Sequence, residues 1–333
     1  MTTKVQLTPK ENYLRMLRRE EYQYVPSMLE PYMAGVTDEL LTPQAAPNGP
    51  VVTGLGVTYV GSPDNGYGAM PKPGETLLSD VTKWRDVVKL PDLSGRDKEA
   101  YYKERSKHVD RSQTAVVTDG GDYFLTLAAL MGFEGALLAM HEEPEEVRAL
   151  LEHISTFYLE VTKDIFHYVK PDVYILMDDD AAYRAPFFSL ETYRELIKPF
   201  HKLHCDIALE NGAFINRHDC GKSEQFIDDW LELGVREWNP VQISNDCRAI
   251  KQKYCGRLAL SGCWDSQGEL GSKFVDKQKL RDALTEYVDT YAPGGDFTFS
   301  AMVGGMGDQS PEAEERREIV REVFFTYARD KVV

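Results

Sequence analysis

The 333-residue sequence predicts an α/β fold, a (β/α)8 barrel of the TIM type, built as a single domain. From Thr114 onward, short runs rich in β-branched residues alternate with longer helical patterns, which implies parallel strands joined by right-handed crossovers. The turn after the first predicted strand reads Glu30-Pro31-Tyr32 and lacks the glycine-rich pattern of an open dinucleotide-binding sheet. Hydrophobic residues make up 42% of the chain, enough for a substantial core.

The first 110 residues predict an N-terminal helix followed by an irregular excursion, and residues 111–333 predict the barrel core. Thr8 is a suitable cap for a helix with Pro9 in its first position, and this helix ends near Arg19. Tyr24–Leu29 predicts the first strand. Residues 43–74 are rich in glycine and proline, and valines between Val51 and Val60 predict a hairpin. Such a stretch forms either the rim of a functional site or a plain surface excursion.

The remaining strands and helices follow in regular order. The predicted strands are Thr114–Thr118, Val173–Met177, Ala213–Asn216, Val235–Trp238, Leu258–Ser261 and Phe297–Val303. The helices between them are predicted near residues 122–140, 144–169, 190–211, 223–233, 245–254 and 277–290. A last helix begins after Ser310, with Pro311 in its first position. With the first strand and one from the excursion, about eight strands are available.

Composition excludes several classes of function. The net charge of −16 disfavours binding to a phosphate backbone, so we expect no nucleic-acid partner. No apolar run approaches the roughly 18 residues that a membrane span requires, and no signal peptide is evident. The five cysteines are an odd number. We therefore expect a cytoplasmic protein with free or metal-bound thiols.

Polar residues end the predicted strands, and strand ends carry the active site of a barrel. The run Asp178-Asp179-Asp180 follows one strand, and we single out Asp178 and Asp180 as catalytic carboxylates. Tyr183 and Arg184 come shortly afterwards and are candidate substrate-binding residues. An exposed acidic loop that caps a helix is the alternative.

The next strand ends at His218 and Cys220, whose side chains point the same way in an extended chain. Imidazole and thiolate together suit zinc, and a nucleophilic pair or two core residues are the alternatives. Cys263 follows another strand and is the candidate third metal ligand. Glu237 is a candidate acid or base, again at a strand end.

Two tryptophans at these strand ends, Trp238 and Trp264, are candidates for the substrate pocket, although either is equally typical of a core. The glycine-rich segments Gly120–Gly121 and Gly304–Gly307 either let a ligand approach the backbone or form tight turns.

Several stretches together resemble the uroporphyrinogen decarboxylase superfamily, most strongly between Gly121 and Pro311. They are Gly132-Phe133-Glu134, Asp178-Asp179, Phe188-Ser189-Leu190-Glu191, Lys198-Pro199-Phe200, His218-Asp219-Cys220-Gly221, Asn239-Pro240-Val241-Gln242, Leu260-Ser261-Gly262 and Ala292-Pro293-Gly294-Gly295. Their order and spacing carry the resemblance, and the fold it implies is the barrel predicted above.

The resemblance favours the corrinoid-dependent methyltransferases over the true decarboxylases of this superfamily. The decarboxylases carry an arginine-rich motif after the first strand, whereas residues 30–35 here contain no arginine. In the methyltransferases, His-x-Cys supplies two zinc ligands, which correspond here to His218 and Cys220. Thiol-methylating members take a third ligand from a cysteine near the last strand, and residues 300–307 contain none. The resemblance then implies ligation by Cys263, Glu237 or an aspartate of the triple run.

Such a site fits members that demethylate methyl ethers, as O-demethylases do, or methylamines, and pass the methyl group to the cobalamin of a corrinoid protein. We therefore expect a methyltransferase with a zinc ion as Lewis acid, a corrinoid carried by a partner protein, and a small methylated substrate. The alternatives are a decarboxylase of a non-tetrapyrrole carboxylate, which Arg184, Arg217 or Lys222 would bind, and a non-catalytic binding protein of the same fold. The donor, the acceptor and a homodimer stay open.

Overall fold

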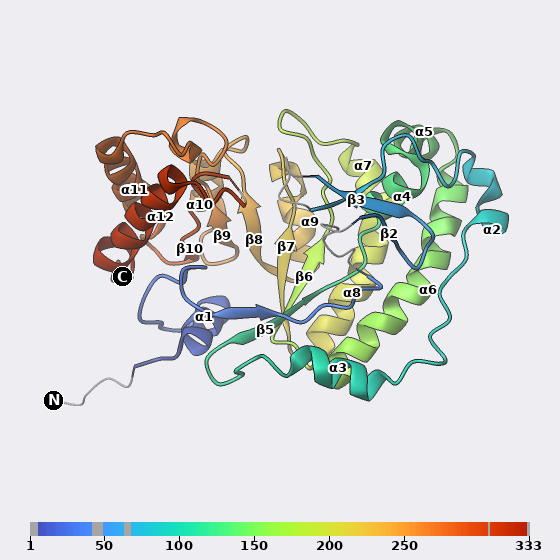
Figure 1. Ribbon diagram of the computed structural model, residues 1–333, viewed down its shortest axis with the longest axis horizontal. Coiled ribbons are helices and arrows are strands. Elements are labelled where there is room, and N and C mark those ends of the chain that lie inside the picture. The colour runs from blue at the N-terminus through green and yellow to red at the C-terminus, as the bar shows by residue number, and fades with distance from the viewer. Residues whose placement is uncertain (1–5, 42–48, 63–67, 306, 332–333) are drawn as a thin grey trace.

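A seven-stranded parallel sheet forms the centre of the computed structural model, which describes residues 6–41, 49–62, 68–305 and 307–331 (Figure 1). Its spatial order is β1-β5-β6-β7-β8-β9-β10, so each strand from β5 onward lies beside its neighbour in sequence. The strands are β1 Met33–Gly35, β5 Ala115–Asp119, β6 Val173–Met177, β7 Phe214–His218, β8 Val235–Val241, β9 Ala259–Gly262 and β10 Phe297–Thr298.

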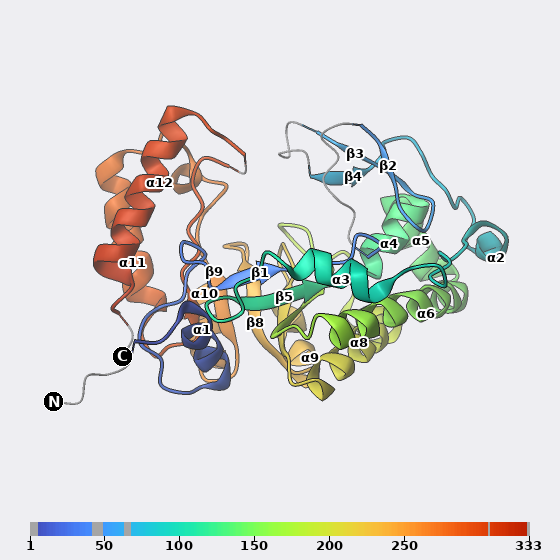
Figure 2. The ribbon, with the colours of Figure 1, turned by 60° about the horizontal axis from the view of Figure 1, so that its bottom comes forward.

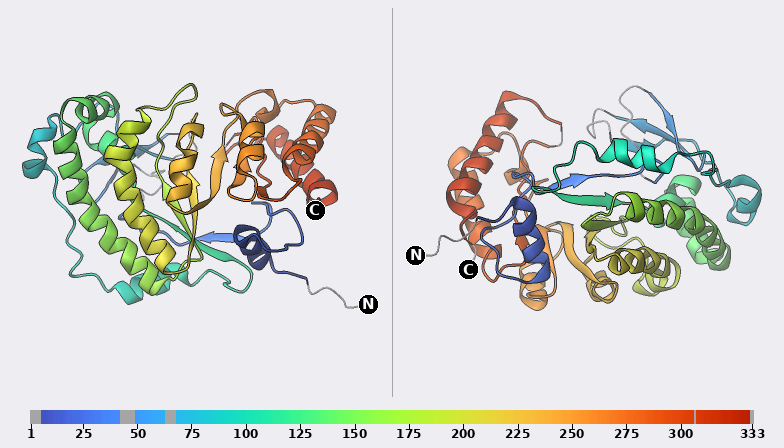
Figure 3. Two further views of the ribbon diagram at one scale, coloured as in Figure 1. Left: turned by 180° about the vertical axis from the view of Figure 1, so that it is seen from behind. Right: turned by 90° about the horizontal axis from the view of Figure 1, so that it is seen from below.

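Helices connect successive strands and pack against the sheet. In the view from behind, the long helices α6 and α8 run side by side along it (Figure 3). The α-helices are α1 Pro9–Arg18, α2 Trp84–Val87, α3 Lys98–Ser106, α4 Phe124–Met131, α5 Phe133–Glu142, α6 Pro144–Tyr168, α7 Leu190–Thr192, α8 Lys198–Glu210, α9 Ile227–Glu232, α10 Cys247–Tyr254, α11 Lys277–Tyr291 and α12 Pro311–Val323. Short 3-10 segments occupy Val81–Lys83, Glu224–Phe226 and Glu269–Gly271, and π-helical turns occupy Tyr193–Ile197 and Phe324–Ala328.

The predicted helix signals are confirmed at both ends of the chain. The Thr8 side chain accepts a hydrogen bond from the Glu11 amide, and Pro9 opens α1. Ser310 caps α12 in the same way through the Ala313 amide, with Pro311 in the first position. Each cap satisfies an amide that the helix itself leaves unpaired.

The predicted hairpin is also confirmed, and it is part of a small second sheet. Strands β2 Val51–Val52, β3 Thr58–Gly61 and β4 Ala69–Pro71 pair antiparallel. This sheet lies beside α4 and α5 (Figure 2). Residues 42–48 and 63–67 of the predicted excursion lie outside the described residues.

The first strand differs from its prediction. Within Tyr24–Leu29, Ser27 makes an isolated parallel bridge to Phe299, and the ladder with β5 begins later, at Met33. The Glu30 amide turns back onto the Ser27 carbonyl, which interrupts the extended chain. Among the described residues the main sheet therefore has seven strands, an α/β arrangement consistent with a TIM-type barrel, and the predicted count of eight is not confirmed.

Two more boundaries moved. The helix predicted over residues 122–140 is two helices, α4 and α5, because the chain breaks at Gly132 with φ 75°. Strand β8 continues to Val241 rather than ending at Trp238, so Trp238 lies inside the strand and not at its end.

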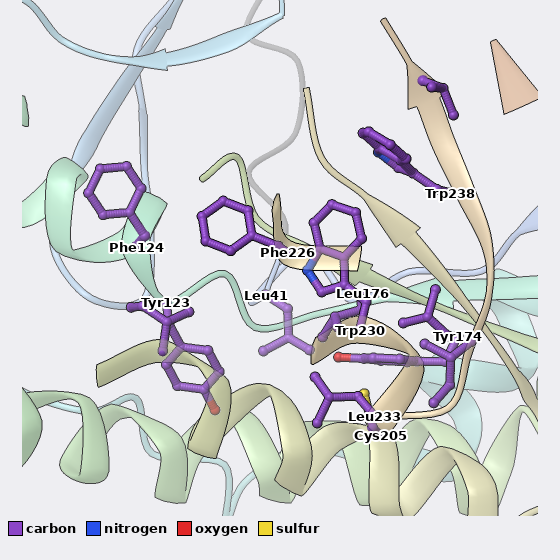
Figure 4. Packing of buried hydrophobic residues seen from close by; sticks show 14 of the residues in the cluster. Leu41, Tyr123, Phe124, Tyr174, Leu176, Cys205, Phe226, Trp230, Leu233 and Trp238 are labelled. Carbon is purple, nitrogen blue, oxygen red and sulfur yellow. The ribbon is translucent and has the colours of Figure 1, made fainter. Parts of the chain in front are cut away.

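The main hydrophobic core lies between the sheet and the helices that cover it, and Figure 4 shows part of it. Trp230 and Trp238 meet there at a ring-centroid distance of 5.1 Å, with Phe226 beside Trp230 at 6.1 Å. Among the described residues, no single helix has both the length and the hydropathy needed to span a bilayer, and α4 with α5 meets those two criteria only as a sharply bent pair.

Candidate metal centre

Buried and half-buried side chains alternate along the ends of β6 and β7. Asp178 and Asp180 are fully buried, and Asp179 between them is half-buried. On the next strand Arg217 and Asp219 are fully buried, while His218 and Cys220 are half-buried. The two-residue period of extended chain thus sends one set of side chains into the core and the other toward the C-terminal end of the sheet.

The buried set forms an ionic clamp between the two strand ends, which we define as Arg217, Asp180 and Asp219. The Arg217 guanidinium donates to Asp180 at 2.5 Å and to Asp219 at 2.9 Å. Asp219 also accepts from the Asp180 amide at 3.1 Å and the Ser223 hydroxyl at 3.1 Å. Each contact bridges β6 and β7 or the turn after β7, so the clamp fixes the separation of the two segments.

One guanidinium faces two carboxylates inside the clamp. Burial raises the pKa of Asp180 well above its usual range, and burial raises the pKa of Asp219 to about 7, against the attraction of Arg217. Burial disfavours the charged form of Arg217, but the same two carboxylates outweigh it and raise the pKa of Arg217. We conclude that the arginine stays charged and that Asp180, which has fewer donors than Asp219, holds a proton.

The half-buried set brings together three different ligand types. Asp179, His218 and Cys220 place one ligand atom each within 4.8 Å of one another. His218 Nε2 lies 3.9 Å from Cys220 Sγ and 4.0 Å from Asp179 Oδ1. In tetrahedral zinc sites, with bonds of about 2.0–2.3 Å, ligand atoms are about 3.3–3.7 Å apart. The two distances from His218 are a few tenths of an ångström longer than this, so a modest closure of the cluster would suit a zinc ion.

Electrostatics around Cys220 favour a cation over a free nucleophile. Burial raises the pKa of the Cys220 thiol to about 12, and the charge of Asp179 raises it further. Burial lowers the pKa of His218, so its imidazole is neutral with a lone pair free for a metal. A thiolate beside a carboxylate needs a compensating positive charge, which a metal ion supplies and a neutral histidine does not.

Gly221 closes the turn that follows Cys220. Its φ is +84°, and a Cβ there would lie 2.3 Å from the Ala181 carbonyl oxygen, so only glycine fits. Its amide donates to the side chain of Gln242, after β8, at 3.0 Å. The turn is thereby held between the segment after β6, which contains Ala181, and the segment after β8, which contains Gln242.

An aromatic cavity of about 380 Å³ adjoins this turn through Gln242. Tyr183 and Trp264, two of the predicted substrate-binding residues, line it together with Asp265. Tyr183 is 56% exposed, whereas Trp264 is buried and donates to the Met302 carbonyl at 3.1 Å. The cavity thus offers one fixed and one accessible aromatic ring, and Gln242 connects its lining to the turn after Cys220.

Two predicted catalytic carboxylates have structural partners. Asp178 accepts the amides of Tyr123, Phe124 and Leu125, each at 2.9 Å, and so caps α4. Asp180 belongs to the ionic clamp. Both side chains are wholly buried and face away from the half-buried cluster.

Glu237 and Trp238 likewise lie in the core. Glu237 accepts hydrogen bonds from Tyr13, Asn216 and Thr298 at 2.5–2.7 Å, and it is 1% exposed. Trp238 donates to the Asp219 carbonyl at 2.9 Å and packs on Trp230, so it lines the core and not the cavity.

The structure does not bring Cys263 to the cluster. Its backbone has φ 60°, and its thiol contacts Cys247 instead. Among the described residues, Asp179 lies beside His218 and Cys220, in the position of third ligand that was predicted for Cys263. Arg184 is exposed and does not line the aromatic cavity.

Sequence reasoning did not single out Asp122 and Gln242. Asp122 is half-buried after β5, and its pKa is raised well above the usual range by burial and then by Asp178, Asp119 and Asp179. Burial and neighbouring charges, that of Asp179 among them, therefore favour the protonated form of the Asp122 carboxyl. Its position beside the glycine pair Gly120–Gly121 at a strand end was the available signal.

Comparison with known proteins identifies the family of this chain and solved structures of similar fold. Residues 104–312 match the model of the family described as uroporphyrinogen decarboxylase (URO-D). No curated protein matches the sequence. A methyltransferase from Methanosarcina mazei is similar in fold, with a TM-score of 0.61 and 14% identity over 96% of this chain and 100% of that one. At this identity the likeness concerns the fold alone.

A sugar phosphate isomerase/epimerase from Parabacteroides distasonis aligns less well. Its TM-score is 0.36 at 12% identity, over 72% of this chain and 81% of that one. This score supports no conclusion about the protein.

Proposed function

Because the chain belongs to the uroporphyrinogen decarboxylase family, we propose that it is a methyltransferase that moves a methyl group from a small methylated donor to a corrinoid protein. We propose further that it holds a zinc ion through Asp179, His218 and Cys220. The fold likeness to a methyltransferase is consistent with this assignment. The cluster of three ligand types at the strand ends is the observation that carries it.

Each residue around the cluster has a distinct task in this proposal. A zinc ion bound there would supply a Lewis acid for the heteroatom that carries the methyl group. Asp122, whose protonated form is favoured by burial and then by its acidic neighbours, donates a proton to the oxygen or nitrogen that leaves. Gln242 holds the turn after Cys220 and thereby keeps the thiol directed at the substrate.

The aromatic cavity suits an aryl methyl ether or a methylamine. Tyr183 and Trp264 offer ring faces for stacking an aryl group, and a ring face also attracts a methylated ammonium. The carboxylate of Asp265 lies in the same lining and favours the cationic donor further. Both donor classes are therefore tested below.

The alternative of a decarboxylase has less support from the charges. Of the three cations expected to bind a substrate carboxylate, Arg217 is wholly buried between two aspartates. Lys222 lies 3.6 Å from Glu224, and Arg184 lies outside the cavity lining. The carboxylates of Asp179 in the cluster and Asp265 in the cavity lining would also repel a carboxylate substrate.

Metal analysis of the purified, untagged protein tests the proposed site. We expect one zinc per chain in the wild type, and loss of it in Asp179→Ala, His218→Ala and Cys220→Ala. Cys263→Ser and Cys205→Ser are matched controls, and both retain zinc. Zinc retained by all three ligand variants would assign the metal elsewhere, and a wild type that binds no added zinc would remove the basis of the proposal.

Activity is tested separately with cob(I)alamin, free or on a corrinoid protein, as the acceptor. Aryl methyl ethers and methylamines are screened as donors, and formation of methylcobalamin is followed spectroscopically. We expect turnover with at least one donor class and none in His218→Ala. Carbon dioxide release from a carboxylate in the absence of corrinoid would instead support the decarboxylase.

A further inference from the structure

Two buried cysteines outside the metal cluster lie against the segment that follows β8. Cys247 is the first residue of α10, and Cys263 directly follows β9. The Cys263 amide donates to the Val241 carbonyl at 2.6 Å, and Cys247 Sγ lies 3.6 Å from the Gln242 carbonyl oxygen. Each thiol shifts the pKa of the other, so the two lie next to one another and form a pair.

The two thiols of this pair differ in acidity. The hydrogen bond from Cys263 lowers the pKa of Cys247, although burial opposes it. The first turn of a helix also stabilises a thiolate, because the unpaired amides there carry partial positive charge. Burial raises the pKa of Cys263 well above its usual range. Cys247 is therefore suited to attack first and Cys263 to respond as a neutral thiol.

Lys251 adds a positive charge next to this pair. It follows Cys247 by one turn of α10, and its side chain is buried. Its ammonium donates to the Gly295 and Asp296 carbonyls, and its charge lowers the pKa of Cys263. Each cysteine keeps 6% of its surface accessible, which excludes bulky reagents but leaves a path for a small oxidant.

We propose that Cys247 and Cys263 are a redox-active dithiol that a peroxide converts into an intramolecular disulfide. The Cys247 sulfur attacks one peroxide oxygen, the O–O bond breaks, and a sulfenic acid and water form. The Cys263 sulfur then attacks the sulfenic sulfur and displaces its hydroxyl, which leaves as water with the Cys263 proton. The two thiols together lose two hydrogen atoms, and the peroxide is reduced to water.

This dithiol does not depend on the proposed zinc site or on methyl transfer. Neither cysteine belongs to the cluster of Asp179, His218 and Cys220. Its test therefore has an outcome even if the protein has another function.

Peptide mapping after oxidation tests the proposal, because trypsin separates the two cysteines. Cleavage at the basic residues gives one peptide of residues 237–248, which contains Cys247, and another of residues 258–273, which contains Cys263. The reduced full-length protein is treated with hydrogen peroxide, alkylated under denaturing conditions and digested without reductant. We expect the two peptides to be linked, with the mass of two hydrogens lost, and dithiothreitol to release them.

Three variants make the result specific. Cys247→Ser and Cys263→Ser each abolish the linked peptide, and Cys205→Ser, which replaces a single buried thiol in α8, retains it. In Cys263→Ser we expect Cys247 to proceed to sulfinic acid, since no thiol resolves it. The proposal would be overturned if Cys247 and Cys263 were both fully alkylated in the peroxide-treated wild type although the peroxide had oxidised the exposed Cys255. A linked peptide that forms only in unfolded protein would overturn it as well.

Discussion

Replacement of Arg217 by methionine removes the centre of the ionic clamp and keeps most of the aliphatic side chain. Arg217, Asp180 and Asp219 have no exposed side-chain surface. Two charges about 4 Å apart attract by about 4 kcal/mol at an effective dielectric of about 20. The loss of one partner from a buried pair costs about 3–5 kcal/mol, because the remaining charge stays buried without compensation. We expect the free energy of unfolding to fall by that amount in Arg217→Met.

Urea unfolding at neutral pH measures this change, and Arg194→Met provides the matched control. Arg194 also pairs with a buried aspartate, Asp229, but it is 54% exposed, and Lys198 remains 2.6 Å from the same carboxylate. We expect a loss of less than about 1 kcal/mol in the control. If the two variants differ by less than about 1 kcal/mol, the clamp does not stabilise the fold as argued.

The clamp also predicts an effect on the metal site. Arg217 holds the segment with Asp179 beside the segment with His218 and Cys220, so zinc affinity should fall about 10- to 100-fold in Arg217→Met, as for other supporting residues of metal ligands. Competition with a chromogenic chelator measures that affinity. An unchanged affinity in a folded variant would show that the ligands hold their positions without the clamp.

Three further changes have defined outcomes. In Gly221→Ala we expect the free energy of unfolding to fall by at least about 2 kcal/mol, with weaker zinc binding. In the control Gly212→Ala, whose added Cβ meets nothing within 4 Å, we expect a loss of about 1 kcal/mol. Equal losses in the two variants would contradict the close contact at Ala181. In Asp122→Asn we expect turnover of ether donors to fall about 10²- to 10⁴-fold with zinc content unchanged, and undiminished turnover would remove Asp122 as the proton donor. Burial lowers the pKa of His204 to about 3. Below about pH 6.5 the unfolded chain therefore binds a proton that the folded chain excludes. The free energy of unfolding then decreases by about 1.4 kcal/mol for each unit by which the pH is lowered, down to about pH 3. Urea unfolding of His204→Gln between about pH 6 and about pH 4 should show a slope smaller by that amount, and equal slopes would place the acid sensitivity elsewhere.

The sequence pattern predicts much of the fold because local signals define its elements. The strand Val173–Met177 has its predicted bounds, and the caps at Thr8 and Ser310 act as expected. The break at Gly132 was missed, because the apolar pattern continues across it while a positive φ changes the direction of the chain.

The candidate site is less predictable, because its side-chain directions depend on distant partners. Three adjacent aspartates look equivalent in sequence, and it is the buried Arg217 on the next strand that draws Asp180 inward and leaves Asp179 facing outward. The strand predicted to end at Trp238 continues to Val241. Glu237 within it is buried by hydrogen-bond partners from distant parts of the chain, Tyr13 and Thr298 among them. The chain turns at Cys263 with φ 60°, which an extended reading does not foresee.

The alternation along Arg217–Cys220 has a consequence for how this protein can change over time. Odd and even positions serve opposite sides of the strand end, so each position tolerates substitutions suited to its own side. A single inserted or deleted residue would instead exchange the sides, placing His218 or Cys220 against the core and a charged clamp residue at the surface. In descendants of this chain the length of the segment should therefore persist longer than the identity of its residues.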